Sequence, residues 1–484
     1  MMVKAGGNVR VHAEAMHGRP ARFQIIPQDL VAHEQKMISR REEMSHPETH
    51  LGQDVVTKHH QNRECLRMRI QTILNRVEKF KSFVYGEASF EVYDDGPALV
   101  VQMKPRRNSR VLCSGCGRPG RAYDRLDERR FEFVPLWGIL VFLAYRMRRV
   151  DCKRCGVTVE MVPWGDGKNQ LTTTYRWYLA SWAKRLSWSE VGSIFRTSWD
   201  SVCRAVEHAV EWGLVHRDVS EVKALGVDEI AWGRGHTYLT LVYDIGAKTK
   251  RLLAVEEDRT QSSLRRCLDS LGKPVCQGVE YVCSDMWKPY LNVIAELVGE
   301  AVHVLDRFHV MQMFSKALDE IRAEEAKRLV RDGYEPVLKK SRWCFLKRPR
   351  NLTDKETVKL SEIVKYNLRT VRAYFLREEF QRLWEYKSAW WAGKFLDEWT
   401  GRVMRSRLEP MKKIARSIRN HRPLILNWFR ARGQISAGAV EGLNNKVKVV
   451  TRKSYGFRTA KVAKLALLHN LGHLPEPERS HRFC

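Results

Sequence analysis

Two short apolar runs in the middle of the chain each end on an aspartate, and they limit what the chain can fold into. The run ALGVDEIAW ends its apolar part at Asp228, and the run VEYVCSDMWKPY ends at Asp285. Short β-branched runs bounded by polar residues predict buried strands. We therefore expect a sheet within residues 225–290, with a carboxylate held rigidly at the end of each of two strands.

A third acidic residue, Glu441, extends this pattern. It lies in ISAGAVEGLNNKVKVV, a stretch that predicts a helix running on into Lys446 and Lys448. Two aspartates on neighbouring strands and a glutamate on a helix can hold two Mg²⁺ ions roughly 3.5–4 Å apart, because hard cations prefer oxygen ligands. The spacing alone equally allows a plainer interpretation, in which both aspartates merely end strands.

Four local sequences carry a resemblance to a known family. They are GVDEIAW with the following GHTYLTLVYD, then VCSDMWKPY, VHVLDRFHV and EGLNNKVKVVTRKSYGFR. From about Cys113 to the C-terminus, the chain resembles the ISL-three (ISL3) family of bacterial insertion-sequence transposases, a group of DDE transposases. The resemblance implies an RNase H-like catalytic domain in which Asp228, Asp285 and Glu441 bind the catalytic metal, two Mg²⁺ or Mn²⁺ ions per active site.

Other polar residues lie close to these motifs in the sequence. Asp306 and His309, in VHVLDRFHV, resemble the family's motif, and a supporting role near the metals and a role in the core both remain open. Glu229 and Asp244 are competing carboxylates. We rank them below the triad because the family motif places the ligands elsewhere.

Two CxxC pairs predict a structural zinc site. Cys113 and Cys116 lie in CSGCG, and Cys152 and Cys155 lie in DCKRCG. Each pair puts two thiolates on a tight turn, and two such turns close a tetrahedral Zn²⁺ site with no open position for catalysis. The pairs are further apart than in most zinc ribbons, and the strand-like insert FEFVPLWGILVFLAYRMRR fits a hairpin between them. The alternative is four core or redox cysteines.

The segment 171–217 predicts three helices. TTTYRWYLASWAKRL forms the first, Ser187 caps the second with Glu190 in capping-box position, and Ser198 begins the third. Three helices with a short turn between the last two fit a helix-turn-helix, whose third helix would face the major groove of DNA. The family resemblance favours this interpretation over a plain helical linker.

The charge of the chain indicates a polyanionic partner. There are 85 Lys and Arg against 56 Asp and Glu, a net charge of +29, which favours DNA or RNA. We expect DNA contacts near the cysteines, at the start of the third helix and after Glu441. The candidates are Arg106, Arg107, Arg110, Arg146, Arg148, Arg149, Trp199, Ser201, Arg204, Lys446 and Lys448.

Several classes of protein are disfavoured. The longest apolar run, Val134 to Tyr145, is too short to span a bilayer, and no signal peptide is evident. Eleven cysteines, several of them single, suit a reducing compartment. A GxxxxGK[ST] phosphate loop is absent, so ATP use is not expected. We expect a cytoplasmic bacterial protein associated with the nucleoid and not with a membrane.

We predict a multidomain α+β chain. Its parts are a poorly ordered leader (1–62), a helix and β-hairpin (63–105), a zinc ribbon (106–165), the helix-turn-helix (171–217), and an RNase H-like domain (222–313 and 433–484) with a helical insertion (314–432). Tryptophans of the insertion could stack on unpaired bases or belong to its core. They are Trp343, Trp384, Trp390, Trp391 and Trp399.

The resulting hypothesis is a DDE transposase that binds the terminal inverted repeats of its own element. It would cut DNA at the ends and join the 3′-hydroxyls to target DNA, as a homodimer or higher oligomer in the DNA complex. Two alternatives remain: a catalytically silent DNA-binding regulator that uses the ribbon and helix-turn-helix, and a nuclease of the same fold that cuts without joining.

Overall fold

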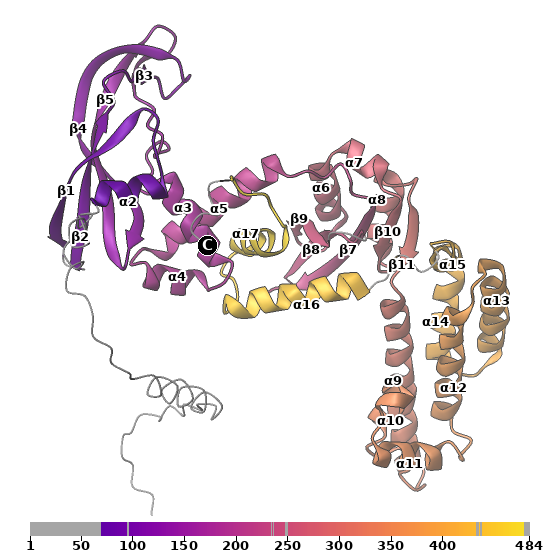
Figure 1. The fold of residues 1–484 in the computed structure, drawn as a ribbon. Coiled ribbons are helices and arrows are strands. Elements are labelled where there is room, and N and C mark those ends of the chain that lie inside the picture. The colour runs from indigo at the N-terminus through magenta and orange to yellow at the C-terminus, as the bar shows by residue number, and fades with distance from the viewer. Residues whose placement is uncertain are drawn as a thin grey trace, which may run out of the picture. The chain divides into compact units, whose positions relative to one another are not determined.

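The computed structural model describes residues 69–478, apart from 94–95, 234, 236, 247–249, 432–434 and 436–437. The predicted leader, and Asp94 and Asp95 within the predicted helix and β-hairpin segment, lie outside the described residues. Within them are two β-sheets and three sets of helices (Figure 1). No helix in this part of the chain is long and apolar enough to cross a membrane.

The first sheet has six strands, and the two CxxC pairs lie in the same stretch of the sequence as these strands. Its order is β1-β2-β5-β4-β3, with β6 on the other edge of part of β5. The elements are α2 (Ile70–Val77), β1 (Phe83–Tyr93), β2 (Gly96–Pro105), β3 (Val111–Leu112), β4 (Pro119–Leu136), β5 (Ile139–Cys152) and β6 (Gly156–Val159). The helix predicted within 63–105 ends at Val77, and Phe83 already pairs with Pro105 in the sheet.

The hairpin predicted between the two CxxC pairs is confirmed. Strands β4 and β5 are antiparallel and turn through Trp137 and Gly138, whose φ angles are 50° and 80°. Two consecutive positive φ values match the tight turn whose twist suits a hairpin. In the core of this sheet, the buried Trp164 ring packs edge-on against Phe83 and Tyr145. Its ring centroid lies 4.7 Å from that of Phe83 and 5.7 Å from that of Tyr145.

Three helices follow, at the predicted places. They are α3 (Thr173–Ala183), α4 (Trp188–Ile194) and α5 (Trp199–His216). The capping box at Ser187 is confirmed, since its hydroxyl accepts from the Glu190 N–H and the Glu190 side chain accepts from the Ser187 N–H. Ser198 caps α5 by accepting from the Ser201 N–H at 3.0 Å. These side chains satisfy N–H groups that a helix start leaves without partners.

The second sheet has five strands in the order β11-β10-β7-β8-β9. The strands β7, β8 and β9 are antiparallel, whereas β10 runs parallel to both β7 and β11. The strands are β7 (Ala224–Ala231), β8 (Tyr238–Asp244), β9 (Arg251–Glu257), β10 (Tyr281–Ser284) and β11 (Val302–Leu305). Strand β7 is central, and it continues past Asp228, whose predicted place at the strand end is therefore wrong. The reason is that residues 228–231 still pair with β8.

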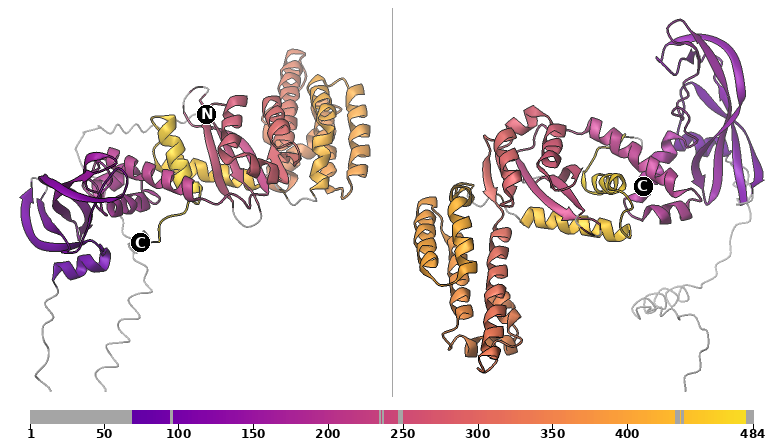
Figure 2. Two further views of the ribbon diagram at one scale, coloured as in Figure 1. Left: turned by 90° about the horizontal axis from the view of Figure 1, so that it is seen from above. Right: turned by 180° about the vertical axis from the view of Figure 1, so that it is seen from behind.

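Helices cover both faces of this sheet (Figures 1 and 2). They are α6 (Gln261–Leu271), α7 (Lys273–Gly278), α8 (Lys288–Leu297), α16 (Gly438–Lys453) and α17 (Ala460–Leu471). Alternate strand residues point to opposite faces. Leu225 and Val227 accordingly pack with α6 and α8, whereas Leu241 and Tyr243 pack in a different core with α16 and α17. The predicted helix around Glu441 is confirmed as α16.

A helical segment separates β11 from α16 and has its own core. Its helices are α9 (Arg307–Arg331), α10 (Arg342–Leu346), α11 (Asp354–Ile363), α12 (Arg369–Gln381), α13 (Ala389–Arg405), α14 (Glu409–Asn420) and α15 (Arg422–Arg430). The predicted start of the insertion, Phe314, lies inside α9. A buried carboxylate, Glu325, joins two of these helices, because it accepts from the backbone N–H groups of Arg369 and Thr370 at the start of α12.

Candidate functional site

Asp228 is held in one orientation at the centre of the second sheet. It lies in β7 opposite Leu241 and is half-buried. Its Oδ1 accepts from the Glu229 N–H at 2.8 Å, and its Oδ2 accepts from Asn444 Nδ2, on α16, at 2.6 Å. The buried Tyr243 hydroxyl donates to Asn444 Oδ1 at 2.8 Å. Burial raises the pKa of Asp228, and these hydrogen bonds and His309 oppose the rise.

Asp285 follows directly after β10, the strand that pairs with β7, so the two aspartates lie on neighbouring strands as predicted. The Trp287 N–H donates to Asp285 Oδ1 at 3.0 Å. Arg259 Nη2 lies 3.3 Å from Asp285 Oδ2 and 2.8 Å from Glu229 Oε1. The guanidinium also lies over the Trp287 ring, 4.6 Å from its centroid. One cation therefore neutralises two carboxylates beside the sheet.

Glu229, ranked below the triad in the sequence, is part of this cluster. Burial raises its pKa to about 7, the charges of Asp285 and Asp228 add to the rise, and Arg259 opposes it. Its Oε2 is buried and has no hydrogen-bond partner among the described residues. Because Glu229 follows Asp228 in a strand, its side chain points to the other face of the sheet. The second competing carboxylate, Asp244, is the last residue of β8, and its Oδ2 lies 3.5 Å from Arg251 Nε.

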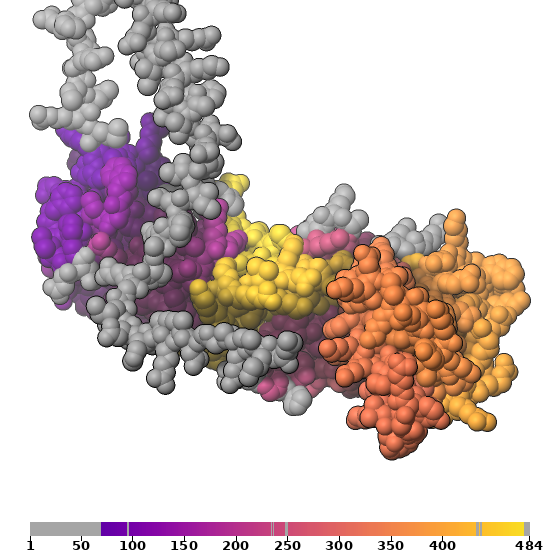
Figure 3. Space-filling model, turned by 90° about the horizontal axis from the view of Figure 1, so that it is seen from below, coloured from indigo at the N-terminus to yellow at the C-terminus, as the bar shows by residue number. Residues whose placement is uncertain are grey.

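Glu441 lies in the first turn of α16 and is exposed. It precedes Asn444 by three residues, a spacing that makes two side chains neighbours on a helix. The helix crosses β7 closely: a Cβ on Gly226 would lie 2.7 Å from Val440 Cγ2. The outer surface of this yellow helix is open to solvent on the face seen in Figure 3.

The three carboxylates do not gather as tightly as metal ligands do. Within the described ranges, the only group of three or more His, Cys, Asp or Glu ligand atoms all within 4.8 Å of one another is the cysteine cluster. Arg259 instead forms an ion pair with Asp285. Hard oxygen donors on β7, after β10 and on α16 nevertheless match what Mg²⁺ requires chemically.

Asp306 and His309 lie near Asp228. Asp306 caps α9 by accepting from the Phe308 N–H at 2.6 Å, and His309 Nε2 lies 3.7 Å from Asp306 Oδ2. Burial raises the pKa of Asp306, the charge of His309 opposes this, and Asp228 adds to it. The structure therefore brings both supporting candidates into the electrostatic environment of Asp228.

The four predicted cysteines come together. The sulfur atoms of Cys113, Cys116, Cys152 and Cys155 all lie within 4.8 Å of one another. Gly117 and Gly156, directly after the CxxC pairs, have φ angles of 67° and 72°, which favour glycine. Thr158 Oγ1 lies 3.1 Å from Cys113 Sγ, and this hydrogen bond is the main cause that lowers the Cys113 pKa to about 6. Four cysteine sulfur atoms this close together fit the tetrahedral Zn²⁺ site predicted from the sequence.

The basic candidates for DNA contact divide into two groups. Arg106, Arg107, Arg110 and Arg146 are exposed. Arg148 instead donates from Nε and Nη2 to Oε2 of the buried Glu160, at 2.9 Å and 2.7 Å. Three more are also engaged within the protein: Arg149 pairs with Asp124, Arg204 with Asp200, and Lys448 with Asn445 at 3.4 Å.

The remaining candidates occupy exposed positions or helix caps. Trp199 is 39% exposed, Ser201 donates to the Ser198 cap, and Lys446 is exposed. Of the tryptophans of the insertion, Trp384 and Trp399 are buried, whereas Trp343, Trp390 and Trp391 are exposed. Core packing therefore accounts for the first two.

Two residues of the site, Asn444 and Arg259, were not among those predicted from the sequence. Asn444 belongs to the Asn–Asn pair of the C-terminal motif EGLNNKVKVVTRKSYGFR. The motif therefore singled out this residue, but it did not indicate that Asn444 binds Asp228. Arg259 follows β9 in a segment without any motif, and its partners lie far away in the chain. No sequence signal identified it.

Similarity to known proteins identifies the class of protein to which this chain belongs. The sequence profile of the ISL3 family of DDE transposases matches residues 225–467, and the chain belongs to this family. The matched region runs from β7 to α17 and contains Asp228, Asp285 and Glu441.

Individual relatives are similar over most of the chain. The transposase for insertion sequence element IS1001 of Bordetella parapertussis is 27% identical over 369 residues, which cover 75% of this chain and 89% of the relative. The transposase for insertion sequence element IS1557 of Mycobacterium tuberculosis is 28% identical over 433 residues, which cover 82% and 94%.

Proposed function

We propose that this transposase binds the terminal inverted repeats of its own insertion sequence, cleaves the DNA ends and joins them to a target. The observation that carries the proposal is the position of the carboxylates. Asp228 lies on the central strand, Asp285 follows the neighbouring strand, and α16 carries Glu441 one turn before a residue that binds Asp228. Family membership supports the same chemistry.

The catalytic region is RNase H-like in this proposal. Its support is the sheet: three antiparallel strands, then two parallel strands added beside the first, with helices on both faces. A fold of this kind does not itself give the reaction, which depends on the site. We assign the metal ligands to Asp228, Asp285 and Glu441.

Divalent metal at these ligands would activate a water or a 3′-hydroxyl and stabilise the leaving oxygen of the phosphodiester. The protein's own residues prepare the site. Asn444 fixes the Asp228 carboxylate, and the Trp287 N–H fixes Asp285. Arg259 balances the negative charge of Asp285 and Glu229 before metal binds. Positioning and charge stabilisation are what phosphoryl transfer chiefly needs from an enzyme.

DNA recognition falls to the N-terminal part in this proposal. The cysteine cluster, holding one Zn²⁺, would stabilise the ribbon that carries the exposed Arg106, Arg107 and Arg110. Helices α3 to α5 would form the helix-turn-helix, with α5 in the major groove. Two or more copies would hold two ends of the element together, and we place this activity at the bacterial nucleoid.

The proposal is tested with labelled inverted-repeat ends, Mn²⁺ and an unlabelled target duplex. We expect both cleaved ends and joined products. Cleavage without any joined product would support the alternative of a nuclease. Specific binding without cleavage would support the silent regulator instead.

A further inference from the structure

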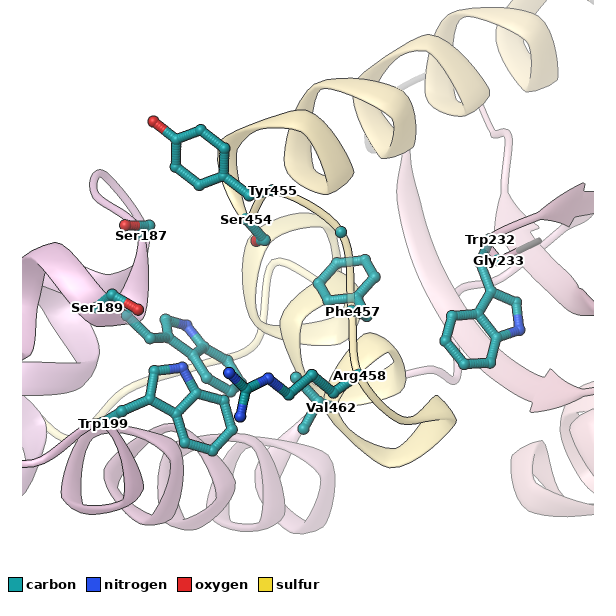
Figure 4. A pocket seen from close by; sticks show the side chains of 12 residues that line it. Ser187, Ser189, Trp199, Trp232, Gly233, Ser454, Tyr455, Phe457, Arg458 and Val462 are labelled. Atoms are coloured by element: carbon teal, nitrogen blue, oxygen red, sulfur yellow. The ribbon is translucent and has the colours of Figure 1, made fainter.

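A cavity of about 650 Å³ lies between α4 and α5 on one side and the loop that joins α16 to α17 on the other (Figure 4). Its walls come from three places: residues 187–189 with Trp199, residues 454–458 with Val462, and Trp232 with Gly233 directly after β7. None of the proposed catalytic residues lines this cavity.

The cavity is rich in aromatic side chains. The Trp188 and Trp199 rings lie 5.6 Å apart at 47°, and Phe457 lies across from them in Figure 4. Tyr455 is 89% exposed, although burying a large aromatic ring would be favourable. Its φ angle of 53° is uncommon for a residue other than glycine. The fold therefore holds a large aromatic ring out at the rim of the cavity.

The cavity is also cationic. Arg458 extends toward Trp199 in Figure 4, and it has no ion pair or hydrogen bond in the described part of the chain. Among the described residues, no aspartate or glutamate lines the cavity. An unpaired guanidinium beside exposed aromatic rings is complementary to a ligand that has both a flat ring and a negative charge.

Lysine side chains join the α4–α5 side of the cavity to the α16–α17 side. Lys453, at the end of α16, donates to the carbonyl groups of Ala183 and Lys184 at 3.3 Å and 3.0 Å. It also donates to Asn470 Oδ1 at 3.0 Å, and Lys461 pairs with Glu207 at 2.5 Å. Helix α16 runs from Glu441 to Lys453 at the edge of the cavity, a length of about 18 Å at 1.5 Å per residue. Along β7, Asp228 lies about 13 Å from Trp232, which lines the cavity.

We propose that this cavity binds an unpaired nucleobase of the DNA end, stacked on Tyr455 and Trp199, with the adjoining phosphate at Arg458. This inference rests on the proposed function and adds a specific site to it. Stacking on aromatic rings tolerates any base, whereas the guanidinium binds the backbone. Because α16 and β7 run from Glu441 and Asp228 to the cavity, they would then fix the distance from the held base to the bond that is cut.

The test uses the full chain and duplexes that carry the ends of the element, with a short single-stranded extension at the cleavage position. One base of the extension is 5-iodouracil, which crosslinks to aromatic side chains under light. We expect a crosslink to Tyr455 or Trp199. Tyr455→Ala should weaken binding of the extended duplex by about five- to a hundredfold, the range known for loss of one stacking ring. Binding of the fully paired duplex should not change.

Two matched variants separate stacking from general damage. Tyr455→Phe should retain the crosslink, because the ring remains. Tyr334→Ala removes another exposed ring, 67% exposed, far from the cavity in sequence, and should leave both duplexes bound as before. Arg458→Gln should weaken binding of the extended duplex, and Arg458→Lys should weaken it less.

Each outcome decides the inference separately from the proposed function. If wild type crosslinks through the cavity but does not cleave, the cavity assignment stands and the proposed catalysis fails. If wild type cleaves and joins ends while Tyr455→Ala binds the extended duplex as tightly as wild type, the cavity assignment is wrong and the catalysis stands. Absence of any crosslink to Tyr455 or Trp199 in wild type overturns the assignment, whether or not cleavage occurs.

Discussion

Replacing Asn444 by leucine should destabilise the second sheet and remove a constraint on Asp228. Asn444 bridges two groups: it donates to Asp228 Oδ2 at 2.6 Å and accepts from the Tyr243 hydroxyl at 2.8 Å. Tyr243 is fully buried, so its hydroxyl would lose its partner without gaining water. Leucine has the same branched side-chain skeleton as asparagine but no polar atom, so the substitution removes both hydrogen bonds.

The size of the effect follows from these two bonds. A hydrogen bond to a charged group is worth about 1.5–3 kcal/mol, and an orphaned buried hydroxyl costs about 1–3 kcal/mol. Asp228 is only half-buried, so water replaces part of the first bond. We therefore expect Asn444→Leu to lower the free energy of unfolding by about 2–4 kcal/mol.

A double-mutant cycle with Tyr243→Phe isolates the cost of leaving the buried Tyr243 hydroxyl without a partner. Tyr243→Phe removes the hydroxyl that Asn444→Leu would orphan, so the double variant should lose about 1 kcal/mol less than the sum of the single variants. Urea unfolding gives the free energies, and hydrogen exchange of the β8 amides assigns the transition to this sheet. Strict additivity, or an unchanged Asn444→Leu variant, would refute the hydrogen-bond bridge.

Three further predictions concern other parts of the chain. Purified protein should contain about one zinc per chain, and a double variant with Cys113→Ser and Cys152→Ser should lose it; full zinc retention there would contradict the site. Burial lowers the pKa of His469 to about 3. The unfolding free energy should therefore fall as pH drops below the ordinary histidine pKa of about 6.5, by on the order of 1 kcal/mol per pH unit. His469→Phe should reduce the slope measured by urea unfolding between pH 7 and pH 5 without removing it, because burial also lowers the pKa of His208 and His303 to about 4; an unchanged slope would count against the prediction. Arg259→Gln leaves Asp285 and Glu229 without their cation, so Mg²⁺ should raise its melting temperature more than it raises that of wild type. The exposed pair variant Arg265→Gln should respond to Mg²⁺ like wild type, and an equal response from all three proteins would contradict a metal site beside Arg259.

Local structure was predictable because its causes are local. The β-branched runs before Asp228 and Asp285 gave the strands, and the Ser187 and Ser198 caps gave the starts of two helices. The CxxC spacing gave the cysteine cluster. The strands and the caps depend on residues within a few positions of one another, and each CxxC pair is itself local.

The contacts that orient the site were not predictable, since they join distant residues. Asn444 and Asp228 are separated by 216 positions, and nothing in either segment specifies the other. Arg148 shows the same limit for charge. It is as basic as Arg146 in the sequence, yet it pairs with the buried Glu160 and has only 13% of its side chain exposed. Which cations remain free depends on tertiary pairing.

The central claim is that Asp228, Asp285 and Glu441 form one metal-binding unit. The most direct measurement is cleavage and joining of labelled inverted-repeat ends by Asp228→Asn, Asp285→Asn and Glu441→Gln, each beside Glu229→Gln. An amide keeps the shape of the side chain but removes the charge that a hard cation needs. Each of the three variants should therefore lose cleavage and joining while inverted-repeat binding stays nearly unchanged, and combinations should lose no more than single variants. Glu229→Gln should keep substantial activity. If Glu229→Gln were inactive while Glu441→Gln cleaved and joined ends at a near wild-type rate, Glu441 would not be the third ligand.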